Sequence, residues 1–137
     1  MVDKNVVLSR VDYLREYLKF LNGVKQKSSD EYLGNPYIYG SAERFLHLAI
    51  ESTIDIGNHI IAGQMFRKPE DNRDIFRILN EEGVLDKELS GKLCGMAGFR
   101  NILVHGYTKL NREMVYSILQ NNLIELEKFI TIIVHYI

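Results

Sequence analysis

The chain has little of what marks several classes of protein. Its 137 residues include one Cys, which excludes an internal disulfide framework and is typical of a reducing compartment. The 2 Pro and 10 Gly exclude a collagen-like or linker-like chain. No apolar run approaches the roughly 20 residues that a membrane span needs, and the N-terminus lacks an apolar signal core. We therefore expect a cytoplasmic protein with no membrane contact, folded as a single domain over residues 1–137.

Charge of neither sign dominates, because the chain has 17 Lys and Arg and 18 Asp and Glu, which gives a net charge of −1. This balance argues against a protein that holds nucleic acid by overall basicity. The cations are nevertheless unevenly placed. Residues 91–112, called the basic segment below, contain no Asp or Glu and carry Lys92, Arg100, Lys109 and Arg112. We expect this segment to form a local cationic surface that can bind phosphate.

Apolar residues recur at three- and four-residue spacing along most of the chain, which is the pattern of amphipathic helices. No stretch alternates in the manner of a strand. The pattern predicts an all-α antiparallel helical bundle of four long helices plus a short fifth helix. The expected long helices cover 7–21, 41–61, 85–105 and 116–137, and the short one covers 75–79. Ser41 is the expected N-cap of the second helix, and 32–40 is interpreted as a connection or an interrupted continuation.

The last expected helix carries a sustained apolar seam. Its members are Tyr116, Leu119, Leu123, Leu126, Ile130, Ile133 and Ile137. Such a seam either packs inside a bundle or pairs two subunits. We favour packing inside the bundle, because that is the usual place of such a seam.

Most signatures of enzymes and metalloproteins are absent from the sequence. There is no Gly-rich phosphate loop, no dinucleotide-binding glycine pattern and no nucleophile elbow. No Cys or His spacing suits zinc either, so we expect no metal and no cofactor. Cys94 lies in an apolar helical pattern and is interpreted as a buried, inert thiol.

Three titratable residues share one face of the second expected helix. Glu51, Asp55 and His59 follow one another at four-residue spacing. They form either a solvated stripe or a polar wall that faces a cleft. A metal site would need further ligands from elsewhere in the chain.

The most informative residues lie at the end of the fourth expected helix. Asn101 and His105 are one helical turn apart, so an amide lies beside an imidazole on one face. Arg100 points about 140° away from His105 on an ideal helix. The two side chains therefore converge on one phosphate only through the reach of Arg, a helix end at Gly106 or a second subunit. The same residues also fit an ordinary helix C-terminus with a capping His-Gly pair and a solvated Arg.

The spacing Arg100-Asn101-x-x-x-His105-x-Tyr107 resembles the Arg-x4-His-x-Tyr motif of the HepT-like group in the HEPN superfamily. The helix around 43–59, the chain length and the C-terminal seam are similar to that group as well. Its members are small helical proteins encoded beside minimal nucleotidyltransferases. The resemblance implies a homodimeric, metal-independent endoribonuclease that serves as the toxin of a toxin–antitoxin pair in bacteria or archaea.

For the site, the resemblance implies that Arg100 and His105 carry catalysis with Asn101 in support. It also implies that the partner nucleotidyltransferase silences the toxin by transferring AMP to Tyr107. RNA is the implied substrate, and imidazole and guanidinium suit its cleavage because one transfers protons near neutral pH and the other stabilises phosphoryl charge. Further candidates for the RNA cleft are Lys92, Lys109, Arg112, Glu51, Asp55 and His59. The alternative is a non-catalytic nucleotide- or substrate-binding subunit of a nucleotidyltransferase complex.

Overall fold

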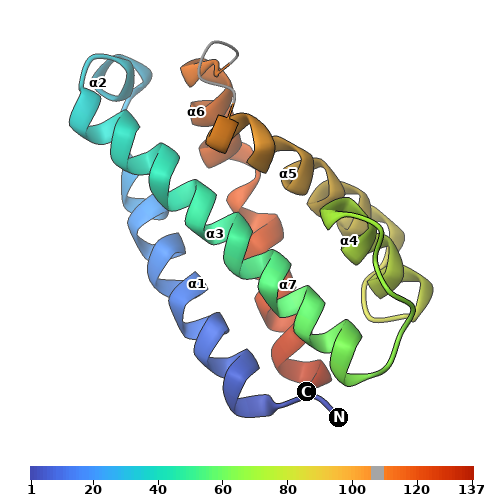
Figure 1. Ribbon diagram of the computed structural model, residues 1–137. Coiled ribbons are helices and arrows are strands. Elements are labelled where there is room, and N and C mark those ends of the chain that lie inside the picture. Colours follow the sequence, from blue (N-terminus) through green and yellow to red (C-terminus); the bar gives the residue numbers. More distant parts are fainter. Residues whose placement is uncertain (106–109) are drawn as a thin grey trace.

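The computed structural model describes residues 1–105 and 110–137, and every regular element in these ranges is an α-helix. The helices are α1 (Lys4–Lys25), α2 (Ser29–Leu33), α3 (Pro36–Gly63), α4 (Asn72–Glu81), α5 (Lys87–His105), α6 (Arg112–Asn121) and α7 (Leu123–Tyr136) (Figure 1). The predicted all-α class is confirmed. Among the described residues, no helix combines the length and the apolar character that crossing a membrane requires.

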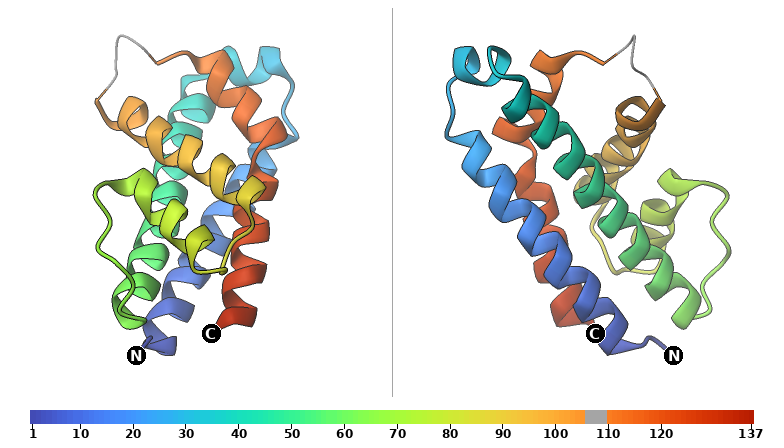
Figure 2. Two further views of the ribbon diagram at one scale, coloured as in Figure 1. Left: turned by 90° about the vertical axis from the view of Figure 1, so that its right-hand side faces the viewer. Right: turned by 60° about the vertical axis from the view of Figure 1, so that its left-hand side comes forward.

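Helices α1 and α3 run side by side in opposite directions, and the short α2 joins them at one end (Figures 1 and 2). α5 packs against α3 and α7, and α7 also packs against α1, so these four helices enclose one core. α4 packs on α3 and α5. Both chain termini lie at one end of the molecule, and the C-terminal end of α5 lies near the other end, close to α6 (Figure 1).

The apolar stripes that the sequence predicts form this core. In α1 the predicted positions are all buried, namely Val7, Val11, Leu14, Leu18 and Leu21. The C-terminal seam also packs inside the chain, because five of its members are at most 5% exposed. They are Leu119, Leu123, Leu126, Ile130 and Ile133. The preference for a seam inside the bundle is therefore confirmed.

The start of α3 differs from the prediction. Ser41 is not an N-cap, because the helix begins at Pro36 and Ser41 donates its hydroxyl to the Tyr37 carbonyl inside it. Asn35 is the N-cap and accepts from the Tyr37 N–H, with Pro36 at the favoured first position. The region before it also contains the unpredicted helix α2, which begins at a capping box formed by Ser28 and Glu31.

The predicted C-terminal helix is two helices rather than one. Asn122 separates α6 from α7 with φ −122° and ψ −4°, and it makes no side-chain capping bond. Asn is a poor helix former, and Asn121 precedes it, so the intrinsic helix propensity is low at this point. The apolar seam continues across the break because the residues on both sides face the same core.

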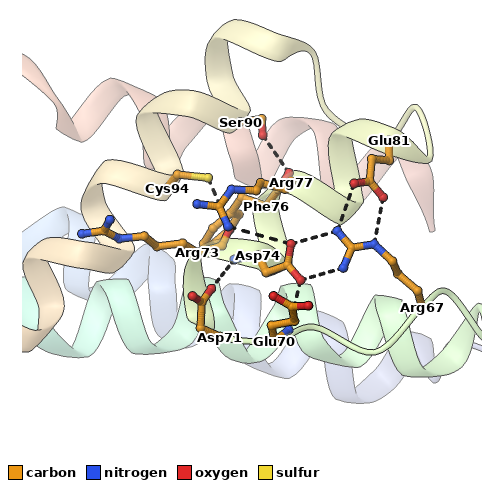
Figure 3. Close-up of polar contacts among 10 residues, drawn as sticks. All are labelled: Arg67, Glu70, Asp71, Arg73, Asp74, Phe76, Arg77, Glu81, Ser90 and Cys94. Carbon is orange, nitrogen blue, oxygen red and sulfur yellow. Dashed lines mark hydrogen bonds and ion pairs between the residues drawn. The ribbon is translucent and has the colours of Figure 1, made fainter.

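Ion pairs fix the connection between α3 and α4 (Figure 3). The Arg67 guanidinium donates to both carboxylate oxygens of Asp74 at 2.7 and 2.8 Å, and it also pairs with Glu81 at 2.9 Å. Asp74 accepts a further bond from the Glu70 N–H at 3.0 Å. The bonds from Arg67 and then from Glu70 lower the pKa of Asp74 to about 2. This network holds α4 in place, and α4 in turn supports α5.

Candidate functional site

The C-terminal end of α5 carries the predicted catalytic residues. The helix is continuous from Lys87 to His105, so the one-turn spacing of Asn101 and His105 holds, and both side chains are exposed. Arg100 is only partly exposed and points toward α3, where its Nε donates to Glu51 Oε1. Its Nη1 lies 3.4 Å from Asn101 Oδ1. One helix end therefore presents an exposed amide and imidazole beside a guanidinium that is held in place.

A second residue of α3 joins this site, and the sequence interpretation missed it. His47 Nε2 lies 3.4 Å from the same Glu51 oxygen that receives Arg100, and His47 Nδ1 lies 3.2 Å from Arg44 Nη1. The His47 side chain is 18% exposed and that of Glu51 29%, so water screens these contacts only in part. The signal for His47 was its four-residue spacing from Glu51, which extends the predicted stripe by one turn.

The rest of that stripe lies apart from Arg100. Asp55 and His59 line a shallow pocket between α1 and α3, together with Arg10 and Asn58. Burial raises the pKa of Asp55, the nearby Glu51 charge raises it further, and Arg10 opposes both effects. The stripe thus divides into a part beside Arg100 and a part beside α1.

The described cations of the basic segment are partly exposed, and each lies close to an acid of another helix. Lys92 pairs with the buried Glu125 of α7 at 3.1 Å and with Glu88 at 3.6 Å. Arg112 lies 3.6 Å from Glu43, and its guanidinium stacks 4.2 Å from the centre of the Tyr39 ring. Once the helices pack, acids distant in sequence approach Lys92, Arg100 and Arg112. Tyr107 and Lys109 lie outside the described residues.

Cys94 packs beside α4 and is partly buried. Its Sγ donates to the Arg73 carbonyl at 3.2 Å, and one turn earlier the Ser90 hydroxyl donates to the Phe76 carbonyl at 2.7 Å (Figure 3). Burial raises the pKa of the Cys94 thiol, so the thiolate is disfavoured at neutral pH. Within residues 1–105 and 110–137, no three His, Cys, Asp or Glu side chains form a group that could hold a metal ion.

The helical arrangement is that of solved HEPN toxins. The structure of a tri-AMPylated HEPN toxin of Shewanella oneidensis in complex with its MNT antitoxin matches with a TM-score of 0.90. The match covers 97% of this chain and 99% of that chain at 28% identity. The model of the ribonuclease HepT-like family matches residues 11–133, so the chain belongs to this family. This is a family of ribonucleases.

Two similar proteins are named as nucleases, and a further solved structure shares the fold. An mRNA nuclease HepT of Shewanella oneidensis is 39% identical over 88 residues, which are 64% of this chain and 66% of that protein. A tRNA nuclease HepT of Aphanizomenon flos-aquae is 28% identical over 115 residues, which are 84% of this chain and 78% of that protein. The crystal structure of a toxin–antitoxin with AMP-PNP matches with a TM-score of 0.87 at 28% identity, covering 96% of this chain and 99% of that chain.

Proposed function

We propose that the chain is a metal-independent endoribonuclease, the toxin of a HEPN–minimal nucleotidyltransferase pair, with Arg100 and His105 as its catalytic residues. The observation that carries this proposal is the end of α5, where an exposed His105 lies one turn beyond Asn101 and beside a half-buried Arg100. Membership in the ribonuclease HepT-like family supports it.

The proposed reaction uses the RNA 2′-hydroxyl as the nucleophile. Its oxygen forms a bond to phosphorus while the bond from phosphorus to the 5′-oxygen breaks. One proton leaves the 2′-hydroxyl and one reaches the departing 5′-oxygen, and His105 carries out proton transfer because imidazole exchanges protons near neutral pH. Arg100 stabilises the charge that gathers on the phosphoryl oxygens, with Asn101 beside it. The products are a 2′,3′-cyclic phosphate and a 5′-hydroxyl.

We also propose that two chains form the cleft. Arg100 turns toward α3 while His105 is exposed, so two copies that face each other through their α5 ends bring both residue types to a shared groove. Contacts of Lys92 and Arg112 with RNA would compete with their pairing to Glu125 and Glu43. Asp55 and His59 lie on the side of α3 that faces α1, where they line a pocket with Arg10.

Tyr107 is the proposed acceptor of inhibitory AMP. It follows His105 by two residues, so an adenylyl group on its hydroxyl would add a bulky anion close in sequence to the proposed catalytic imidazole. The negative charge of this group would repel the RNA backbone, and the group itself would occupy the proposed cleft. The AMPylated state of the Shewanella toxin supports this part of the proposal.

The direct test is RNA cleavage in excess chelator. We expect purified protein to cleave RNA under this condition and His105→Ala to lose at least about a hundredfold in rate, the usual contribution of general acid–base catalysis. His135→Ala is the matched control, because His135 is an exposed imidazole on α7 that contacts the Thr131 carbonyl of its own helix. Activity that depends on added metal, or that survives His105→Ala, would contradict the mechanism.

The second candidate is a non-catalytic nucleotide-binding subunit. The solved toxin–antitoxin with AMP-PNP favours it, because that similar structure holds a nucleotide analogue. This candidate predicts that the chain cuts no RNA but binds nucleotide in a manner that Arg100→Ala weakens. Cleavage that is lost in His105→Ala would exclude it.

A further inference from the structure

Four side chains form a continuous polar chain across α3 and α5. In order they are Arg44, His47, Glu51 and Arg100, and the last two are 49 residues apart in sequence. A guanidinium only donates, so Arg44 Nη1 donates to His47 Nδ1 and the His47 proton lies on Nε2. That Nε2 is buried 3.4 Å from Glu51 Oε1, a contact too poorly aligned to count as a hydrogen bond. The Glu51 carboxylate thus lies between the His47 imidazole on one side and Arg100, its hydrogen-bond donor, on the other.

The contact with Glu51 uses only one edge of the Arg100 guanidinium. Glu51 receives the Nε proton, and the 3.4 Å contact with Asn101 Oδ1 involves Nη1 at the outer end of the group. Nη2 makes no hydrogen bond to the described residues. A guanidinium held through Nε still presents its planar fork, which matches the oxygens of a phosphate.

We propose that Glu51, backed by His47, is a positioning residue that orients the Arg100 guanidinium toward the phosphate of RNA. This inference rests on the proposed ribonuclease function. A long Arg side chain that is already fixed loses less rotamer freedom when the phosphate arrives, and a correct orientation matters most in the transition state. Glu51 has a positioning role here and does not itself touch the substrate.

Glu51 has two opposite effects on the substrate. Its contact with Nε aligns Arg100, whereas its negative charge repels the RNA phosphate near the same guanidinium. Removing the charge therefore weakens catalysis and strengthens binding. A residue that only stabilises the fold does not separate these quantities in this way.

The test compares kcat and KM for RNA cleavage in the full chain. We expect Glu51→Gln to lower kcat at least about tenfold, with KM unchanged or lower, because misaligned catalytic groups lose rate in the chemical step. Glu51→Asp keeps the charge on a shorter stem, so its kcat should also fall while its KM does not decrease. Glu16→Gln, which removes an exposed carboxylate from α1, is the matched control and should change neither quantity.

Three results would overturn the positioning role. They are an unchanged kcat in Glu51→Gln, a raised KM with kcat intact, and a fall in kcat that matches the loss of folded protein in circular dichroism. The second result would make Glu51 a substrate-binding residue. Loss of kcat without loss of fold supports the proposal.

A measurement without RNA keeps the two proposals separate. In ¹⁵N-labelled protein the Arg100 Nε–H should exchange slowly with water, and Glu51→Ala should make this exchange at least about tenfold faster. Faster exchange in Glu51→Ala supports the positioning contact whether or not the wild type cuts RNA. A wild type that cuts no RNA would contradict only the proposed function. Unchanged exchange in Glu51→Ala contradicts the positioning role.

Discussion

Asp74 shows how one buried acid is stabilised at the residue scale. Its side chain is 6% exposed, and Arg67 and the Glu70 N–H hold its pKa at about 2, below the ordinary value of about 3.8. A depressed folded-state pKa means that the folded state favours the charged form. The resulting stability is complete above about pH 4 and is lost as the pH falls toward 2.

We therefore expect Asp74→Asn to be less stable than wild type at pH 7 and nearly equal to it at pH 2. Urea unfolding midpoints measured from pH 7 to pH 2 would show the wild-type curve falling toward that of the variant. Asp30→Asn, which removes an exposed carboxylate from α2, should run parallel to wild type. A constant gap between wild type and Asp74→Asn across this range would show that the Asp74 charge is not responsible.

Lys92, a candidate residue of the RNA cleft, also has a structural role. It donates to Glu125, whose side chain is 3% exposed, and this bond raises the pKa of Lys92. Lys92→Met leaves a buried carboxylate without its cation, so we expect the Tm to fall, and Lys92→Met with Glu125→Leu should recover much of the loss. Thermal melts of the two variants test this. A Tm unchanged in Lys92→Met, with weaker RNA binding, would assign Lys92 to RNA instead.

At the scale of the element, Gly57 sets how closely α3 approaches α4. A Cβ at this position would lie 2.5 Å from Ile75 Cγ2, a methyl group of a β-branched core residue that has little room to move. Overpacking of this kind costs roughly 1–3 kcal/mol, against a helix-propensity gain of about 1 kcal/mol from replacing Gly. We expect Gly57→Ala to lower the free energy of unfolding by up to about 2 kcal/mol.

The matched control lies on the same helix. A Cβ at Gly40 would meet no atom within 4 Å, so Gly40→Ala should stabilise the chain by about 0.5–1 kcal/mol through helix propensity alone. Urea unfolding of both variants gives the comparison. Equal and stabilising effects at the two positions would show that α4 can shift to accommodate the methyl group.

Local sequence patterns predict where helices form better than they predict the residues at which the helices begin and end. The burial of Val7, Val11 and Leu14 follows from helical periodicity, which depends only on residues a few positions apart. Ser41 looked like an N-cap because Ser favours that role, but Asn35 followed by Pro36 is the stronger start, and this N-cap lies six residues earlier. The break at Asn122 was hidden because the apolar seam continues on both sides of it.

At the scale of the whole molecule, the proposed dimer can be tested by mixing inactive chains. Arg100→Ala and His105→Ala each lack one proposed catalytic residue. If the groove joins Arg100 of one chain to His105 of the other, unfolding and refolding the two variants together should recover cleavage that neither shows alone. Analytical ultracentrifugation of the mixture would report the dimer. Dimers without recovered activity would mean that each chain needs both of its own residues.

The sequence by itself determined the helical class, the core stripes and the one-turn spacing of Asn101 and His105, because all three depend on residues close together in the chain. Only the tertiary structure decided what each charge faces. Packing pairs Arg100 with Glu51, Lys92 with Glu125 and Arg112 with Glu43. A segment without acids is therefore compensated by acids from other helices, since an ion pair depends on distance in space, which the order of residues does not fix.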